Sequence, residues 1–351
     1  MLDGAKPDHA GVSKESQLLS SMVKDPALSL VDRLESYEDI INLEVGDTSF
    51  TRARNVEREQ GTRQLYLKFE GNNPTGTHKD RIAFNQCLDA LRREYDTITL
   101  GSCGNYGAAV ALAASLAGIR CVIVIPEMYH TDRIAEIESY GAEINRISGS
   151  YEETVLYSIR MAKEKQWYDA NPGGANTPLQ IMSYAEIANE IYDVLREAPK
   201  MVAVPVSNGT LIAGVYRGFV SLYKRGKTSR IPRMIAASST HKNPIIYSFR
   251  KNLDQCIDLI PEKIKETRVN EPLINWHSFD GEEALFALRQ SGGDAFHISD
   301  EKMLRLSKVL KEKEGLHVLP ASTAGLAALI ELNASEPLEP DRYVIILTGK
   351  R

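Results

Sequence analysis

The chain has 351 residues, of which 25% are charged and 43% hydrophobic, and its formal net charge is −5 at pH 7. This length exceeds a single typical core and predicts about two globular domains. A net negative charge without a clustered basic stripe argues against nucleic acid as a partner. No early apolar stretch resembles a signal peptide, and no run approaches the roughly 18 apolar residues of a membrane span. We therefore expect a cytoplasmic protein that does not contact a membrane.

The predicted elements alternate between strands and helices. The first forty or so residues are polar, and helical patterns within them suggest a cap on the body of the protein. Strands are predicted at 65–69, 97–100, 121–125, 143–147, 167–169, 201–206, 234–237 and 343–348. Helices are predicted at 16–23, from 30 onward, and at 82–93, 132–140, 151–165, 178–195 and 301–313. Continuous apolar strands that alternate with helices predict parallel sheets covered by helices on both faces. Such sheets bind ligands beyond the C-terminal ends of their strands.

Lys79 stands between the first of these strands and the helix that follows it. An amine near a helix N-terminus feels a local positive potential, which disfavours its charged form. The uncharged amine is the form that attacks an aldehyde to make an imine. A lone lysine beside a turn is nevertheless typical of a solvated surface charge, so further segments have to support this interpretation.

Two further segments run from a strand through a turn of small residues into a helix. The first, Thr-Leu-Gly-Ser-Cys-Gly-Asn-Tyr-Gly at 99–107, offers turn amides for an anion such as a carboxylate. Its Asn105 can donate a hydrogen bond to a phenolate-type oxygen. The second, 201–214, would place backbone N–H groups around a phosphate, although it matches neither a Walker A loop nor a Gly-x-Gly-x-x-Gly fingerprint. Tight strand-to-helix packing would explain either segment alone.

Taken in order, these segments resemble the fold-type II family of pyridoxal-phosphate enzymes, and within it the threonine synthase-like branch. Residues 73–81 (Asn-Pro-Thr-Gly-Thr-His-Lys-Asp-Arg) resemble the Asn-Pro-Thr-Gly-Ser-Phe-Lys-Asp-Arg block of that branch. Residues 102–105 are similar to its Ser-Thr-Gly-Asn loop, and 205–210 to its phosphate loop. Two late segments, 319–325 and 344–349, resemble its Glu-Pro-Ala-Ser-Ala-Ala-Ala segment and its terminal strand ending in Leu-Thr-Gly.

The resemblance implies a two-domain α/β fold of the tryptophan synthase β type, with mostly parallel twisted sheets covered by helices. A larger, cofactor-anchoring domain is expected from residues 1–55 and 181–351. A smaller, mobile domain of residues 56–180 is expected to carry Lys79 and the 102–106 loop. The usual assembly of the family implies a homodimer.

The resemblance also implies roles for single residues. Lys79 would hold pyridoxal 5'-phosphate as an internal imine and shuttle protons at the substrate carbons. Asn105 would contact the ring oxygen of the cofactor, and Thr348 would face its pyridine nitrogen, where a neutral hydroxyl steers the cofactor toward elimination and replacement. The residues expected at the cofactor phosphate are Ser207, Asn208, Gly209, Thr210 and Leu211. Those expected at the substrate carboxylate are Ser102, Cys103, Gly104, Asn105 and Tyr106.

Several positions depart from the threonine synthase pattern. His78 replaces the usual phenylalanine, is typical of the tryptophan synthase β-type block, and could stack beside the cofactor or contact a substrate anion. Tyr106 stands where these enzymes carry a small hydroxyl residue, and 171–176 (Asn-Pro-Gly-Gly-Ala-Asn) where they offer a basic residue. Leu319 replaces a glutamate, and Ser207 a glycine of the phosphate loop.

Our first interpretation is a lyase similar to threonine synthase, which converts O-phosphohomoserine and water to threonine and phosphate. That reaction needs a second anion pocket, preferably with arginine or lysine, and the departures fall at this pocket. The alternative is pyridoxal-phosphate-dependent β-elimination or β-replacement on serine, O-phosphoserine or a related small amino acid, with a pocket closed by Tyr106. A minor alternative is a non-catalytic protein that binds the cofactor.

No catalytic metal is expected. The four cysteines show neither a Cys-x-x-Cys pair nor metal-binding spacing, and the seven histidines form no His-Glu-x-x-His pair. His297, in a strand-like segment, is expected at the surface or in the core.

Overall fold

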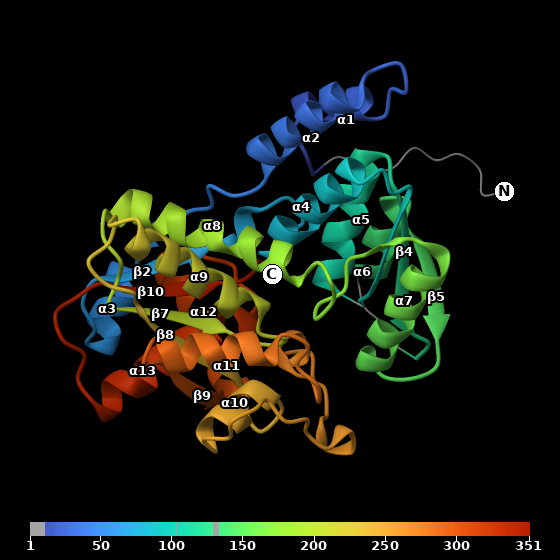
Figure 1. Cartoon of the computed structure of the whole chain (residues 1–351). Helices are drawn as coiled ribbons and strands as arrows, with labels where there is room; N and C mark the ends of the chain where they lie inside the picture. Colours follow the sequence, from blue (N-terminus) through green and yellow to red (C-terminus); the bar gives the residue numbers. More distant parts are fainter. Residues whose placement is uncertain (1–10, 103, 129–132) are drawn as a thin grey trace. The chain divides into compact units, whose positions relative to one another are not determined.

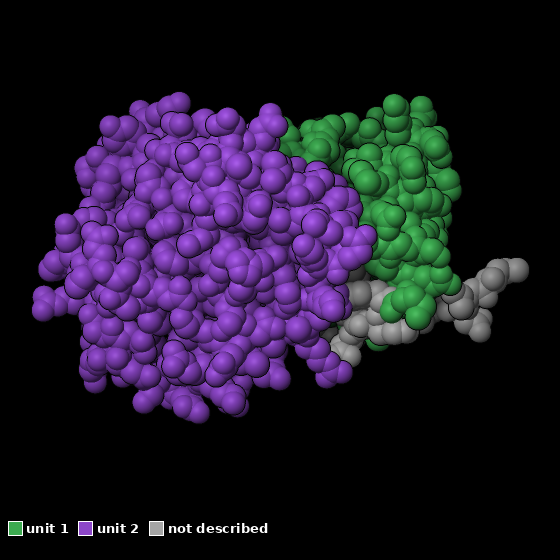
Figure 2. All heavy atoms as spheres, turned by 90° about the horizontal axis from the view of Figure 1, so that it is seen from below, with its two compact units in different colours: residues 1–46, 73–180 green, residues 47–72, 181–351 purple. Residues whose placement is uncertain are grey.

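A computed structural model describes residues 11–102, 104–128 and 133–351. The chain divides into two compact units, coloured separately in Figure 2. Unit 1 comprises residues 1–46 and 73–180, and unit 2 comprises residues 47–72 and 181–351. The expected domains divided the chain at the same place near residue 180, but grouped the residues before 73 differently. The units differ there because 47–72 pair into the sheet of unit 2, while the helices before them pack onto unit 1.

Unit 1 is built on a four-stranded sheet in the order β5-β4-β3-β6, in which every pairing is parallel. Figure 1 labels two of these strands, β4 and β5. Its strands are β3 (Thr97–Gly101), β4 (Arg120–Pro126), β5 (Glu143–Ile147) and β6 (Tyr168–Asp169). Its helices are α1 (Lys14–Val23), α2 (Leu30–Glu44), α4 (Lys79–Arg92), α5 (Asn105–Ala117), α6 (Arg133–Ser139) and α7 (Tyr151–Lys165). Every residue of β3 is buried, as expected for a parallel strand with helices packed against it.

The N-terminal helices α1 and α2 pack onto the helices of unit 1 through polar contacts. Ser20 Oγ donates to the carbonyl oxygen of Leu116 at 2.8 Å, and the Tyr37 hydroxyl donates to that of Ala113 at 2.9 Å. Both helices begin at a serine N-cap whose side chain accepts from the backbone of the first turn. These contacts hold both helices against α5.

Unit 2 is built on a six-stranded sheet in the order β1-β2-β10-β7-β8-β9. Only the β1–β2 pairing is antiparallel among the strand pairs of the described residues. Its strands are β1 (Phe50–Arg52), β2 (Leu65–Phe69), β7 (Met201–Pro205), β8 (Arg233–Ser239), β9 (Asp294–Ile298) and β10 (Tyr343–Leu347). Its helices are α3 (Arg54–Gln60), α9 (Thr210–Lys224), α10 (Pro244–Arg250), α11 (Gly281–Gln290), α12 (Asp300–Glu314) and α13 (Ala324–Ser335). The short 3₁₀ turns are η1 (Glu70–Asn72), η2 (Pro261–Lys263), η3 (Glu271–Leu273) and η4 (Pro320–Thr323).

Helix α8 (Thr177–Leu195) begins in unit 1 and continues into unit 2, where it packs closely on α9. A Cβ at Gly214 would lie 2.6 Å from the carbonyl oxygen of Ile181, and one at Gly218 would lie 2.4 Å from that of Ala185. Because the two glycines are four residues apart, they share one face of α9. That face is what lets α8 approach the helix that carries the predicted phosphate loop.

The prediction of an α/β fold with mostly parallel sheets is confirmed. The predicted strands agree with the observed ones to within a residue or two. The short strand β1 was not predicted, and β9 was noted only as a strand-like segment. Among the helices that the structure describes, none is long and apolar enough to cross a membrane.

Candidate active site

Lys79 is the first residue of α4, three residues earlier than the predicted helix start. Its side chain is half-buried, and its Nζ lies 5.4 Å from the centroid of the Tyr106 ring. His78, the N-cap, is also half-buried and makes no side-chain capping bond, whereas Thr77 Oγ1 accepts from the backbone N–H of Lys79 at 3.2 Å. The lysine amine thus stands at the start of a helix, above an aromatic ring of the same unit.

The turn before Lys79 is held by the buried carboxylate of Asp80. Thr75 donates its backbone N–H to Asp80 Oδ2 at 3.0 Å and its hydroxyl to Oδ1 at 2.9 Å. Burial raises the pKa of Asp80 to about 7, while the hydrogen bonds from Thr75 act in the opposite direction. The bonds from Thr75 to this carboxylate explain why α4 begins at Lys79 and Asp80. These two polar residues precede the apolar pattern that predicted the helix.

Tyr106 lies under the lysine with its hydroxyl turned into the core of unit 1. The hydroxyl donates to the carbonyl oxygen of Ala170 at 2.7 Å and accepts from Nε2 of Gln86. Only 7% of the residue is exposed, and burial raises the pKa of Tyr106 well above its usual value. The hydroxyl is therefore bonded within the core of unit 1, while the ring faces the amine.

The 102–106 loop ends β3 and starts α5. Ser102 Oγ accepts from the backbone N–H of Gly107 at 3.0 Å, which leaves its proton available to donate to a carboxylate. Cys103 lies outside the described residues. Asn105 is half-buried in the first turn of α5, and its Oδ1 accepts from Nε of Arg133 at 3.1 Å. No sequence motif singled out Arg133, because the contact joins positions 28 residues apart.

In unit 2, the 207–211 loop joins β7 to the 15-residue helix α9. The N-cap, Gly209, has φ of 102°, a conformation that residues with a Cβ rarely adopt. A Cβ there would lie 2.7 Å from the carbonyl oxygen of Asp280 and 2.9 Å from Ala284 Cβ. The backbone N–H groups that open α9, including those of Thr210 and Leu211, have no acceptor within the helix, so this terminus can hold a phosphate.

The side chains of two asparagines support this loop. Asn243 Nδ2 donates to the carbonyl oxygen of Ser207 at 3.0 Å, and Asn275 Nδ2 donates to Asn208 Oδ1 at 3.0 Å. The hydroxyl of Thr210 donates its proton to the buried carboxylate of Asp280. Thr210 can therefore offer a phosphate its backbone N–H but not its hydroxyl proton.

Thr348 follows β10 and is half-buried, and its hydroxyl lies 3.0 Å from Ser322 Oγ. Ser322 is fully buried and accepts from the backbone N–H of Gly349 at 3.0 Å. Such a contact orients the Thr348 hydroxyl, which no motif would have shown. The sequence analysis missed Ser322 as a neighbour of this position.

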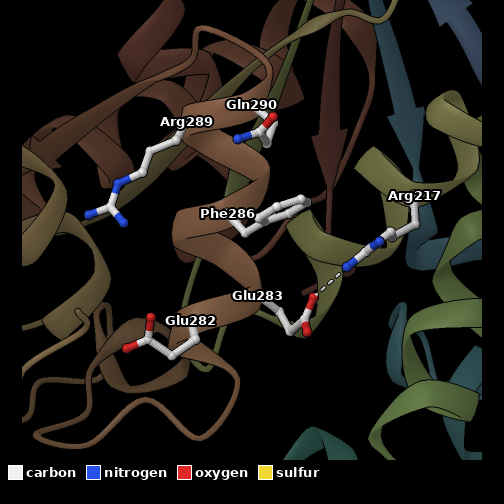
Figure 3. A pocket seen from close by; sticks show the side chains of 6 residues that line it. All are labelled: Arg217, Glu282, Glu283, Phe286, Arg289 and Gln290. Atoms are coloured by element: carbon white, nitrogen blue, oxygen red, sulfur yellow. Dashed lines mark hydrogen bonds and ion pairs between the residues drawn. The ribbon is translucent and has the colours of Figure 1, made fainter. Parts of the chain in front are cut away.

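Outside these loops, the described residues include a pair of histidines and a surface hollow. Among the described residues, no group of three or more histidine, cysteine or acidic side chains could hold a metal ion. His297 is half-buried beside His241, and burial lowers its pKa to about 4. A hollow of about 430 Å³ on α9 and α11 contains none of the predicted site residues (Figure 3). It is lined by Arg217, Glu282, Glu283, Phe286, Arg289 and Gln290.

The chain belongs to the pyridoxal-phosphate dependent enzyme family, which it matches over residues 41–349. Within the family it is similar to threonine synthases. That of Methanocaldococcus jannaschii is 31% identical over 316 residues, covering 88% of this chain and 75% of the relative. That of Halalkalibacterium halodurans is 31% identical over 313 residues, covering 88% and 83%. The chain is thus a pyridoxal-phosphate-dependent lyase, as the resemblance predicted.

Solved structures confirm the fold-type II architecture. The processed form of threonine deaminase isoform 2 from Solanum lycopersicum superposes with a TM-score of 0.72 and 17% identity, covering 93% of this chain and 92% of that chain. Serine racemase from Dictyostelium discoideum gives a TM-score of 0.73 and 17% identity, covering 92% and 98%. At these identities the likeness concerns the fold alone.

The residues present fit pyridoxal 5'-phosphate. Unit 1 supplies an amine at a helix start and an asparagine whose amide oxygen is already bound, so that its N–H₂ group can serve as a donor. Unit 2 supplies the N-terminus of α9, where a Cβ on the N-cap would collide with its neighbours, and a half-buried hydroxyl after β10. Each unit, taken by itself, thus carries groups of a chemistry that pyridoxal 5'-phosphate requires.

We expect Gly209→Ala to weaken cofactor binding and to lower the free energy of unfolding by about 2 kcal/mol or more. The added Cβ costs about 1–2 kcal/mol in a left-handed conformation, and its collision with Asp280 displaces the loop. Gly226→Ala is the matched control, because Gly226 also has a positive φ, 68°, but open space around the added Cβ. Denaturant unfolding and titration of the apoprotein with pyridoxal phosphate measure both effects. Equal cofactor affinity in the two variants would contradict a tight 207–211 loop.

Proposed function

We propose that the chain converts O-phosphohomoserine and water to threonine and phosphate, with Lys79 covalently bound to pyridoxal phosphate. The observation that carries this proposal is the placement of Lys79 at the start of α4, above the ring of Tyr106, in a chain similar to threonine synthases. Bound pyridoxal phosphate supplies an electron sink for the substrate Cα. A homodimer in the cytoplasm is the assembly and location that we propose with it.

The positions of the protein groups support the following roles. Lys79 removes a proton from the substrate Cα and then one from Cβ, and phosphate leaves Cγ. One of the two protons is returned to Cγ, which becomes the methyl group of threonine, and the other to Cα. Water adds its hydroxyl at Cβ, and its remaining proton leaves with the phosphate as hydrogen phosphate. The Ser102 hydroxyl and the backbone N–H groups that open α5, including that of Tyr106, hold the substrate carboxylate. Asn105 donates to the ring oxygen of the cofactor, Thr348 faces the ring nitrogen, and the 207–211 loop holds the phosphate.

A second candidate reaction is β-elimination or β-replacement on a serine-type amino acid. The 171–176 segment, where threonine synthases offer a basic residue, has none, and its Asn171 is fully buried. The Asn171 amide is committed internally, accepting from the Gly101 N–H at 2.7 Å and donating to Asp169 Oδ1 at 2.7 Å. A cation for a second phosphate group therefore has to come from elsewhere, whereas a serine-type substrate needs none.

Product analysis separates the two reactions. With O-phosphohomoserine we expect threonine and inorganic phosphate in equal amounts, and neither product above background with Lys79→Ala. Serine and O-phosphoserine test the alternative, since β-elimination yields pyruvate and ammonia. Release of inorganic phosphate does not by itself distinguish the two reactions, because β-elimination of O-phosphoserine also produces phosphate. The formation of threonine is therefore the deciding measurement. Pyruvate from serine, without threonine from O-phosphohomoserine, would refute the first reaction and support the second.

A further inference from the structure

Arg133, the first residue of α6, joins two loops of unit 1 through one guanidinium group. Its Nε donates to Asn105 Oδ1 at 3.1 Å, and a terminal nitrogen donates to the carbonyl oxygen of Thr75 at 3.0 Å. The other terminal nitrogen is 2.5 Å from Glu136 Oε2, one turn further along α6. Only 22% of the Arg133 side chain is exposed. One side chain therefore ties the Thr75 turn, which precedes Lys79, to the first residue of α5.

The contact with Arg133 decides which way the Asn105 amide points. A guanidinium carries five N–H donors and no acceptor, so the amide atom that faces it has to be the oxygen. The amide nitrogen of Asn105 is then on the side away from the guanidinium, where it can donate. Without Arg133 the amide could turn over and present its oxygen, which repels the oxygen of a ligand.

The contact with Thr75 acts on the other loop. Thr75 is held on one side by Asp80 and on the other by Arg133, so the turn before Lys79 is fixed from two directions. Burial raises the pKa of Asp80, whereas the positive charge of Arg133 lowers it and so favours the carboxylate that accepts from Thr75. Lysine could not replace Arg133 fully, because a single ammonium cannot match three acceptors with the planar fork of arginine.

We propose that Arg133 is a positioning residue for the cofactor site, which fixes the donor orientation of Asn105 and anchors the turn that leads to Lys79. The inference rests on the proposed function to the extent that Asn105 donates to the ring oxygen of pyridoxal phosphate. In this role Arg133 acts through its bonds to Asn105 and Thr75.

The test compares Arg133→Gln, Arg133→Lys and the control Arg120→Gln in the full-length protein. Arg120 forms an exposed ion pair with Glu143 at 2.6 Å between β4 and β5 of the same unit, away from both loops. For Arg133→Gln we expect roughly tenfold weaker binding of pyridoxal phosphate to the apoprotein, the size of one lost charge-assisted hydrogen bond. Arg133→Lys should fall between Arg133→Gln and wild type, and Arg120→Gln should match wild type.

A spectroscopic measurement distinguishes positioning from simple support of the fold. A hydrogen bond from Asn105 to the ring oxygen stabilises its deprotonated form, so losing it should raise the pH midpoint of the visible absorbance of the bound cofactor. We expect this upward shift in Arg133→Gln, in Arg133→Lys and in Asn105→Ala. In the Asn105→Ala background, Arg133→Gln should add no further shift.

Two results would overturn the inference: an unchanged midpoint in both Arg133 variants, or a shift from Arg133→Gln that persists undiminished in the Asn105→Ala background. If Arg133→Gln does not fold, Arg133→Lys still decides, because it keeps the charge beside Glu136. Failure of the proposed function appears differently, as a wild-type protein that binds no pyridoxal phosphate at Lys79 or forms no threonine. Cofactor affinity and midpoint do not depend on which substrate is turned over.

Discussion

Lys79→Ala is expected to lower turnover by more than about a thousandfold and to remove the visible absorbance of the bound cofactor. General acid–base catalysis by one group contributes about 10²–10⁴-fold, and the same amine also holds the cofactor. The position of Lys79 at the start of α4, above the ring of Tyr106, leaves the neighbouring backbone intact when its side chain is shortened. Alanine also favours helix formation, so the variant should fold.

The control for this prediction is Lys163→Ala, an exposed lysine in the last turn of α7 in the same unit. It should keep the absorbance and the turnover of the wild type. Borohydride reduction of the wild-type protein followed by peptide mapping should place the pyridoxyl label on Lys79. A label on another lysine, or substantial residual turnover in Lys79→Ala, would remove Lys79 from its role.

The central strands could be predicted from the sequence because burial on both faces leaves continuous apolar runs. Every residue of β7 and of β10 is buried, and both were predicted to within a residue. The strands at the two edges of the unit 2 sheet lack this signal. Strand β1 has three residues, two of them exposed, and β9 mixes buried and half-buried positions. An edge strand pairs on one side only, so its sequence carries less of the pattern.

The segments that we propose to hold the cofactor were singled out because small residues and a lysine follow strand ends in an order that resembles the family. What surrounds them was not predictable in the same way. The start of α4 at Lys79 depends on the buried bonds between Thr75 and Asp80, and polar residues give no helical periodicity. Arg133 contacts Asn105 across 28 residues, and Ser322 contacts Thr348 across 26. Such pairs become visible only when the fold brings them together.

Tyr106 was expected to close a substrate pocket, and its observed contacts lead to a different prediction for its variants. Tyr106→Phe keeps the ring under Lys79 and removes the hydroxyl that contacts Gln86 and Ala170. The carbonyl oxygen of Ala170 keeps a second donor, Gln180 Nε2, at 3.3 Å, but the buried amide of Gln86 loses its acceptor. An unsatisfied buried donor of this kind costs about 1–3 kcal/mol. We therefore expect Tyr106→Phe to be less stable than wild type but to retain most of its kcat.

Tyr106→Thr restores the small hydroxyl residue typical of threonine synthases but removes the ring. Loss of a buried aromatic ring lowers the free energy of unfolding by about 3–5 kcal/mol. The amine of Lys79 also loses its contact with the ring of Tyr106. We expect lower kcat/KM for every substrate, in equal proportion, because the hydroxyl of Tyr106 is bonded within the core to Gln86 and Ala170. Denaturant unfolding and kcat/KM for O-phosphohomoserine and serine measure the two effects separately. A selective gain for O-phosphohomoserine would instead show that the ring excludes the phosphate-bearing substrate, and Tyr106 would then be a determinant of specificity.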